Sequence, residues 1–251
     1  MNRIIAVTLI GFISGMIGTG MGGIITFFIK NPTRRFMAVL LGFTSGIMLS
    51  VVCFDLLPEA FKISGIGMSL VGITVGVSAI FFMDQLLPKK AYGRKNLIDK
   101  NESATAFIKS GILLGIGIAM HNFPEGLAVG SGFALDNSLG LGLAIVIGIH
   151  DMPEGIAMAA PLKMGGVNRY KILLYTLLAG IPMGFGAFIG ELLGEISPEL
   201  ICLCLSFAGG AMLYITCGEL IPKSQSIHKG RISTIGMIAG IMSGIYISGV
   251  L

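Results

Sequence analysis

The chain has 251 residues, of which 54% are hydrophobic and only 12% are charged, and its mean hydropathy is +0.89. Soluble domains carry about 25% charged residues, so this sequence has too few of them to cover a soluble surface. Composition therefore excludes an ordinary soluble domain. The net charge of +4 does not indicate a nucleic-acid partner, because the basic residues gather in a few loops.

Eight apolar stretches follow one another along the chain, and each is about as long as the roughly 20 residues that cross a bilayer as a helix. We expect membrane spans near residues 4–29, 36–57, 64–87, 107–134, 139–162, 170–190, 200–221 and 232–251. Residues 1–251 are thus predicted to form a single all-α transmembrane domain. Its longest loop, 88–106, lies between spans 3 and 4.

The basic residues predict how these spans are oriented. Fifteen of the 17 Lys and Arg residues lie in or beside the loops that follow spans 1, 3, 5 and 7, and Lys223, Lys229 and Arg231 are those after span 7. Short basic loops remain in the cytoplasm. Both termini are therefore predicted to lie outside, in a multi-pass protein of the cell (inner or plasma) membrane, with the lipid bilayer as a partner.

Two internal repeats predict how the spans are arranged. Residues 40–60 in span 2 align without gaps with residues 204–224 in span 7, and residues 121–130 in span 4 match residues 150–159 in span 5. The two spans of each pair cross the membrane in opposite directions. This predicts a 3+2+3 arrangement, in which spans 1–3 are inverted relative to spans 6–8 and spans 4 and 5 form their own inverted pair, as in many secondary transporters. Chance similarity among glycine- and leucine-rich helices is the alternative.

The repeat in spans 4 and 5 carries most of the chemistry. Each copy places a histidine and a glutamate four residues apart, on one face of a helix and near the middle of its span. Imidazole and carboxylate groups together suit Zn²⁺, Fe²⁺ or Mn²⁺. Ionisable residues at this depth usually mark an ion path. The candidate ligands are His121, Asn122, Glu125, His150, Asp151 and Glu154.

Two other uses of these polar groups remain open. They could form a buried network that only holds two helices together, in a metal-binding structural membrane protein. They could also belong to an intramembrane metal-dependent hydrolase, but that chemistry calls for a His-Glu-x-x-His pattern. Asn122 and Asp151 stand where its general base would be, and no second histidine follows at the required spacing. An enzyme is therefore not predicted.

With these paired His-x-x-Pro-Glu-Gly motifs, the chain resembles the ZIP (zinc/iron permease) family of metal transporters, and more narrowly its GufA-like bacterial branch. The resemblance covers essentially the whole chain. It implies transport of a divalent transition-metal ion into the cytoplasm, foremost Zn²⁺ and also Fe²⁺, Mn²⁺ or Cd²⁺. The ion would be the transported substrate rather than a cofactor. A homodimer is left open as a further partnership.

The resemblance also implies roles for single residues. One metal position is formed in the family by residues that match His121, Glu125, His150 and Glu154, together with Met48 on span 2. A second position uses residues that match Asn122 and Asp151, shares the two glutamates, and adds a glutamate on span 6. In this sequence Met183 stands where that glutamate would be, which predicts one tightly held metal rather than two.

Three further acidic residues are candidates for the metal's entrance or exit. Asp55, at the outer end of span 2, aligns with an entrance position in the family, and Glu59 is close to it. Glu219 is the repeat mate of Asp55 and would lie at the inner end of span 7. Solvated charges at helix ends are the alternative for all three.

Overall fold

In a computed structural model, the described residues are 3–29, 33–86, 104–228 and 230–250, and they form helices joined by short turns, with no strand among them. The helices, in chain order, are α1 (Arg3–Phe28), α2 (Arg34–Ser50), η1 (Val51–Leu56), α3 (Leu57–Leu86), α4 (Ala104–Leu135), α5 (Asn137–Met164), α6 (Arg169–Gly194), α7 (Pro198–Ile215), η2 (Thr216–Leu220), α8 (Ile221–Ile227) and α9 (Ile232–Val250). The segments η1 and η2 are π-helical. Most of the predicted loop 88–106 lies outside the described residues.

Within the described residues, seven helical stretches are long and apolar enough to cross a membrane. Five of the predicted spans correspond to α1, α4, α5, α6 and α9, and a sixth, span 7, corresponds to the continuous stretch from α7 through α8. Predicted spans 2 and 3 fall together in the seventh stretch, Arg34–Met83, which has 50 residues. A straight helix of that length would measure about 75 Å, far more than the roughly 30 Å of a bilayer core.

The long stretch is not straight, because its backbone leaves the helical conformation at Ser64 and Gly65. Gly65 has φ +74° and ψ 172°, a conformation that residues other than glycine rarely adopt. Beyond this break α3 runs parallel to α7: Ser69 lies 3.4 Å from the Cys202 sulfur, and further along both helices Gly76 packs against the backbone of Phe207.

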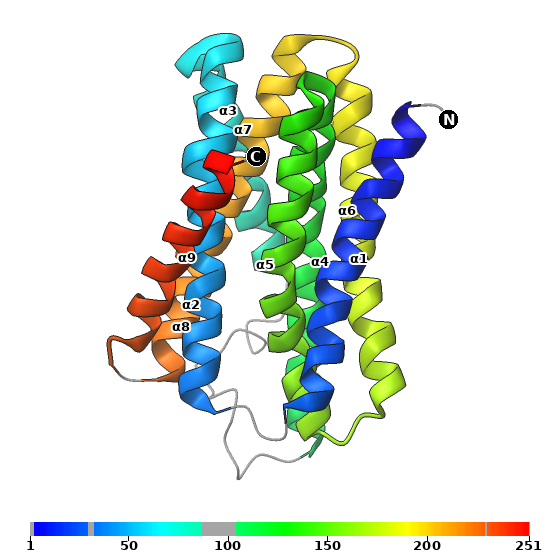
Figure 1. The fold of residues 1–251 in the computed structure, drawn as a ribbon, viewed down its shortest axis with the longest axis vertical. Helices are drawn as coiled ribbons and strands as arrows, with labels where there is room; N and C mark the ends of the chain where they lie inside the picture. Colours follow the sequence, from blue (N-terminus) through cyan, green and yellow to red (C-terminus); the bar gives the residue numbers. More distant parts are fainter. Residues whose placement is uncertain (1–2, 30–32, 87–103, 229, 251) are drawn as a thin grey trace.

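Before the break, the chain follows the same neighbour in the opposite sense. Met48 lies beside Thr216, whereas Leu57, nine residues later, lies beside Gly209, which precedes Thr216 in the chain. The α2–η1 segment therefore runs antiparallel to α7, and the chain reverses its direction at Gly65 (Figure 1).

The two π-helical segments fall at matching places in the sequence repeat that relates residues 40–60 to residues 204–224. Each is followed by proline, Pro58 after η1 and Pro222 after η2. Proline has no N–H to donate to the preceding turn and its ring crowds the carbonyl there. A wider π turn just before the proline accommodates this disturbance, and such turns often occur at functional sites.

The helices pack in two groups. One contains α1, α4, α5 and α6, and the other contains α2, α3, α7, α8 and α9 (Figure 1). Glycines bring the helices of the first group very close: Gly126 on α4 lies against the backbone of Met183 on α6, and Gly186 on α6 lies against that of Phe123. Small residues at helix contacts are typical of membrane bundles.

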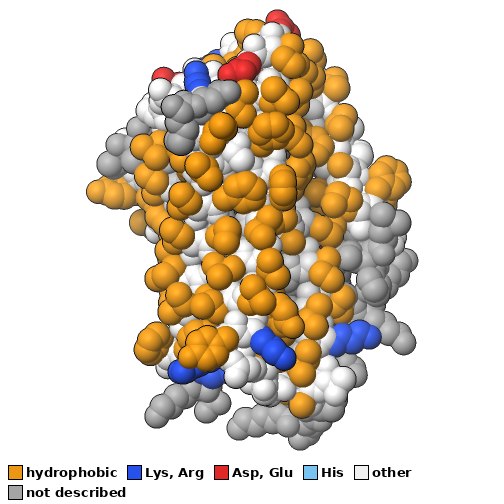
Figure 2. Space-filling view, turned by 90° about the vertical axis from the view of Figure 1, so that its right-hand side faces the viewer, with side chains coloured by type: hydrophobic (Ala, Val, Ile, Leu, Met, Phe, Trp, Pro, Cys, Tyr) orange, Lys and Arg blue, Asp and Glu red, His pale blue; other side chains and the backbone are white. Residues whose placement is uncertain are grey.

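The outer surface is apolar along the middle of the molecule. On α1, the exposed side chains Ile5, Leu9, Ile13 and Ile17 recur every four residues and so form one stripe. Figure 2 shows hydrophobic side chains over most of one face, with Lys and Arg near both of its ends and acidic residues near its upper end. A wide apolar belt between charged ends, on an all-helical bundle, characterises an all-α membrane protein.

Candidate metal-binding site

The six predicted ligands lie on the facing, antiparallel helices α4 and α5, and all of them are buried, with at most 6% of each residue exposed. The two helices follow each other directly, because Asp136 alone separates them. The Asp136 carboxylate caps α5 by accepting hydrogen bonds from the N–H groups of Ser138, at 2.8 Å, and Leu139, at 3.3 Å. This tight turn brings the two motif copies to the same depth.

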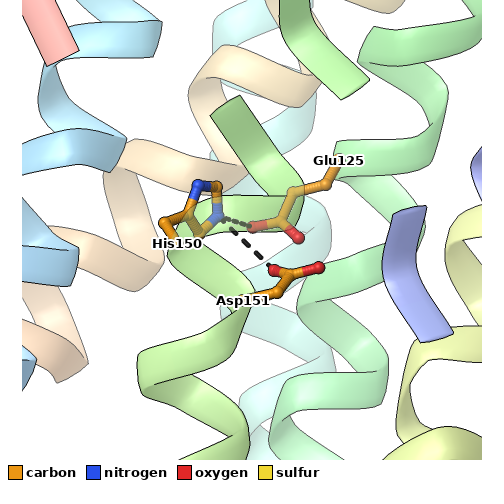
Figure 3. A group of neighbouring side chains, drawn as sticks. All are labelled: Glu125, His150 and Asp151. Carbon is orange, nitrogen blue, oxygen red and sulfur yellow. Dashed lines mark hydrogen bonds and ion pairs between the residues drawn. The ribbon is translucent and has the colours of Figure 1, made fainter. Parts of the chain in front are cut away.

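Three of the six residues form a compact cluster (Figure 3). Ligand atoms of Glu125, His150 and Asp151 all lie within 4.8 Å of one another. The His150 Nε2 atom is 3.1 Å from Glu125 Oε1 and 3.6 Å from Asp151 Oδ1. One imidazole nitrogen and carboxylate oxygens at this spacing can surround a single divalent ion.

Several polar atoms of the motif have no hydrogen-bond partner within the part of the chain that the structure describes. They include Nδ1 of both histidines, Oε2 of Glu125 and both carboxylate oxygens of Asp151 and Glu154. Buried polar atoms are nearly always paired, since leaving them unpaired costs free energy. Their concentration here indicates a site for a cation rather than a network that ties two helices together.

Asn122 is oriented by α6. Its side-chain amide donates a hydrogen bond to the Ala179 carbonyl oxygen at 2.8 Å. The Asn122 Oδ1 atom is one of the buried atoms without a partner among the described residues. This oxygen therefore remains available for a metal ion.

The two methionines singled out in the sequence are both fully buried. Met48 on α2 accepts a hydrogen bond from the Thr216 hydroxyl at 3.6 Å between oxygen and sulfur. Met183 on α6 packs with its backbone against Gly126, the residue after Glu125. Met183 thus lies beside the cluster, and Met48 packs against the start of η2.

His121 and Glu154 are outside the compact cluster and face the other helix group. They line a cavity of about 30 Å³ together with Glu219 and Lys223. The His121 Nε2 atom is 3.9 Å from Glu219 Oε2. The candidate site therefore continues from α4 and α5 to the helical stretch that ends in α8.

The sequence predicted Lys223 in the loop after span 7 and did not identify it as a residue of the site. That assignment was wrong: the helix continues beyond residue 221 through α8, and Lys223 is half-buried beside the site. A signal was present in the sequence, since Lys223 follows Glu219 by four residues and therefore shares its helix face.

The predicted entrance residues Asp55 and Glu59 line a different and larger cavity, of about 540 Å³. Asp55 accepts a hydrogen bond from Ser248, and Glu59 pairs with Lys62 at 2.5 Å. Asp136 lines the same cavity, which the sequence did not predict. Hydrogen bonds from the side chain and backbone of Ser138 hold the pKa of Asp136 below its usual value, so this carboxyl stays ionised.

Buried histidine and carboxylate ligands on two antiparallel helices of an apolar bundle define a membrane protein that can hold a metal ion inside the bilayer. Residues 94–250 match the family model described as ZIP zinc transporter. The chain belongs to this family, whose members are transporters rather than enzymes. Membership confirms the resemblance at family level, while the narrower GufA-like branch stays a prediction.

Similar proteins extend the match along almost the whole chain. Zinc transporter ZupT of Corynebacterium glutamicum is 35% identical over 240 residues, which cover 90% of this chain and 91% of the relative. Zinc transporter ZupT of Streptococcus mutans is 32% identical over 238 residues, 90% of each chain. The protein of the same name in Akkermansia muciniphila is 32% identical over 259 residues, 96% of each chain.

Proposed function

We propose that this protein transports Zn²⁺ across the cell membrane into the cytoplasm, through the buried site on α4 and α5. One observation carries the proposal: the six buried candidate ligands of the repeated motif leave several nitrogen and oxygen atoms unpaired within the described residues. Its relatives named zinc transporter ZupT support zinc as the substrate. The metal is cargo, so the ligands must both bind it and let it go.

The ligand set extends the proposal to other metals. Imidazole nitrogen with carboxylate oxygen also accommodates Fe²⁺, Mn²⁺ and Cd²⁺, which differ more in geometry and availability than in affinity for such groups. Met48 is the thioether that the family resemblance adds to the ligand set, and such a ligand would favour the softer ions of this group, Zn²⁺ and Cd²⁺.

We further propose eight membrane crossings, with both termini outside. The reversal at Gly65 supports this count, because it divides the stretch Arg34–Met83 into two opposed helices. In Figure 1, α1 begins and α9 ends in the upper half of the molecule, whereas the Arg-rich start of α2 lies at the lower end. The lower end would then face the cytoplasm by the positive-inside rule.

Topology can be tested with single cysteines in a background that lacks the four native cysteines. A cysteine at Asn96 should react with an impermeant thiol reagent only after the cell is opened, and a cysteine at Glu195 should react in intact cells. Labelling of residue 96 from outside would exclude the proposed orientation.

Transport itself is tested with purified protein in liposomes. Zinc uptake should saturate with concentration, because each ion must occupy the buried site before it moves. Glu125→Ala and Glu154→Ala should abolish uptake while the proteins still purify as folded species. Rapid uptake by either variant would place the path elsewhere. Cross-linking in the native membrane, compared with the size in detergent, would decide whether the chain forms a homodimer.

A further inference from the structure

The small cavity beside the site is lined by His121, two acidic groups and one lysine. Glu154 comes from the candidate site on α5, and Glu219 and Lys223 come from η2 and α8. The rest of the lining is largely apolar and includes Leu41, Leu114, Ile118 and Leu220. In such surroundings charges are poorly screened, so each of them acts strongly on an ion nearby.

Lys223 is well placed to act on the site from its inner side. It lies one helical turn beyond Glu219 and is half-buried. The α8 helix lies in the lower half of the molecule, toward the end where the basic start of α2 is found (Figure 1). A lysine stem is long and flexible, so it can pack against the apolar side chains of the lining while its ammonium group lies at the acidic groups.

We propose that Lys223 is a tethered cation that competes with the transported metal for Glu154 and Glu219, and thereby promotes release of the metal toward the cytoplasm. This rests on the proposed site and on the inward direction of transport. A divalent ion that leaves the site abandons negative carboxylates in a medium of low dielectric constant, which makes departure costly. The ammonium group neutralises part of the negative charge of the carboxylates, so the metal is held less tightly and leaves faster.

The charge can be separated from the bulk of the side chain by two substitutions. Lys223→Met keeps a long apolar side chain and removes the charge, and Lys223→Arg keeps the charge. Lys171→Met, at an exposed position on α6, is the matched control. Zn²⁺ binding to the purified proteins is measured by titration calorimetry, and the saturated uptake rate is measured in liposomes.

With Lys223→Met we expect Zn²⁺ to bind about tenfold more tightly, because a repulsive charge that lines the same cavity is worth at least this much at an effective dielectric constant of about 20. The saturated uptake rate should fall severalfold, and Lys223→Arg should restore both quantities. Lys171→Met should leave them unchanged.

Three results would overturn the proposal. The first is unchanged zinc affinity in Lys223→Met. The second is tighter binding without slower uptake. The third is equal impairment of the Met and Arg variants with a lower unfolding temperature, which would make Lys223 a structural tie to Glu219. Failure of the proposed site itself would look different, since Glu154→Ala would then still bind and transport zinc.

Discussion

The contact between Gly126 and Met183 offers a sharp test of how closely α4 and α6 must approach for the site to work. An ideal Cβ added at Gly126 would lie 1.9 Å from the Met183 carbonyl oxygen and 2.7 Å from its carbon. Non-bonded heavy atoms need about 3.5 Å, so Gly126→Ala must move the two backbones apart by about 1.5 Å. Neither side of this contact is a flexible side chain that could give way.

The expected consequences follow from this displacement. Overpacking of a close contact costs about 1–3 kcal/mol of stability, so the unfolding temperature of Gly126→Ala should fall. Glu125 is the neighbouring residue, and a shift of about 1 Å in a reacting group can cost a factor of about 100 in rate in enzymes. We therefore expect zinc uptake to fall at least about tenfold while folded protein can still be purified.

The assay compares zinc uptake into liposomes per unit of folded protein, with thermal unfolding of the same samples. Gly67→Ala is the matched control, because a Cβ at Gly67 would meet nothing within 4 Å. If Gly126→Ala had the same zinc uptake and the same unfolding temperature as Gly67→Ala, the reasoning would be refuted.

Three further predictions concern metal number and stability. Met183→Glu should allow a second zinc ion to bind, measured by titration, whereas the native protein should hold one tightly; two ions of equal affinity in the native protein would contradict this. Lys163→Met should lower stability by about 1–2 kcal/mol, because the Lys163 ammonium group donates hydrogen bonds to three carbonyl oxygens at the end of α1. If this variant unfolded at the same denaturant concentration as the native protein, this role would be excluded. In the native protein the buried Glu191 carboxylate lies 2.7 Å from the Arg3 guanidinium. Arg3→Gln should lower the unfolding temperature more than Glu191→Gln, because it leaves this buried charge without its partner. The reverse order of unfolding temperatures would contradict this reasoning.

The residues that could be predicted from the sequence are those whose relations are local. His121 and Glu125 are four residues apart, and so are His150 and Glu154, so helical periodicity alone places each pair on one face. The repetition of this motif predicts that the two faces belong to one site. The structure places all four in one buried region, although the compact cluster contains Asp151 and leaves His121 and Glu154 toward the neighbouring helices.

The relations that could not be predicted depend on packing between distant parts of the chain. Met48 and Thr216 are 168 residues apart, and nothing in either segment indicates their contact. Lys223 appeared to be a loop residue because basic residues and Pro222 usually follow the end of a span. In the structure this segment is the helix α8, which packs against α2, and its lysine lies beside the site.

The paired π turns bear on the ancestry of the protein. A π turn is a rare, wider turn inside an otherwise α-helical segment. Here a π turn occurs at matching places in the aligned segments 40–60 and 204–224, and in each segment a proline stands two residues beyond it. Two such rare turns at equivalent positions are improbable as a coincidence. A duplication that carried one such turn into both halves would explain the match, and it would require the inverted repeat that the sequence predicts.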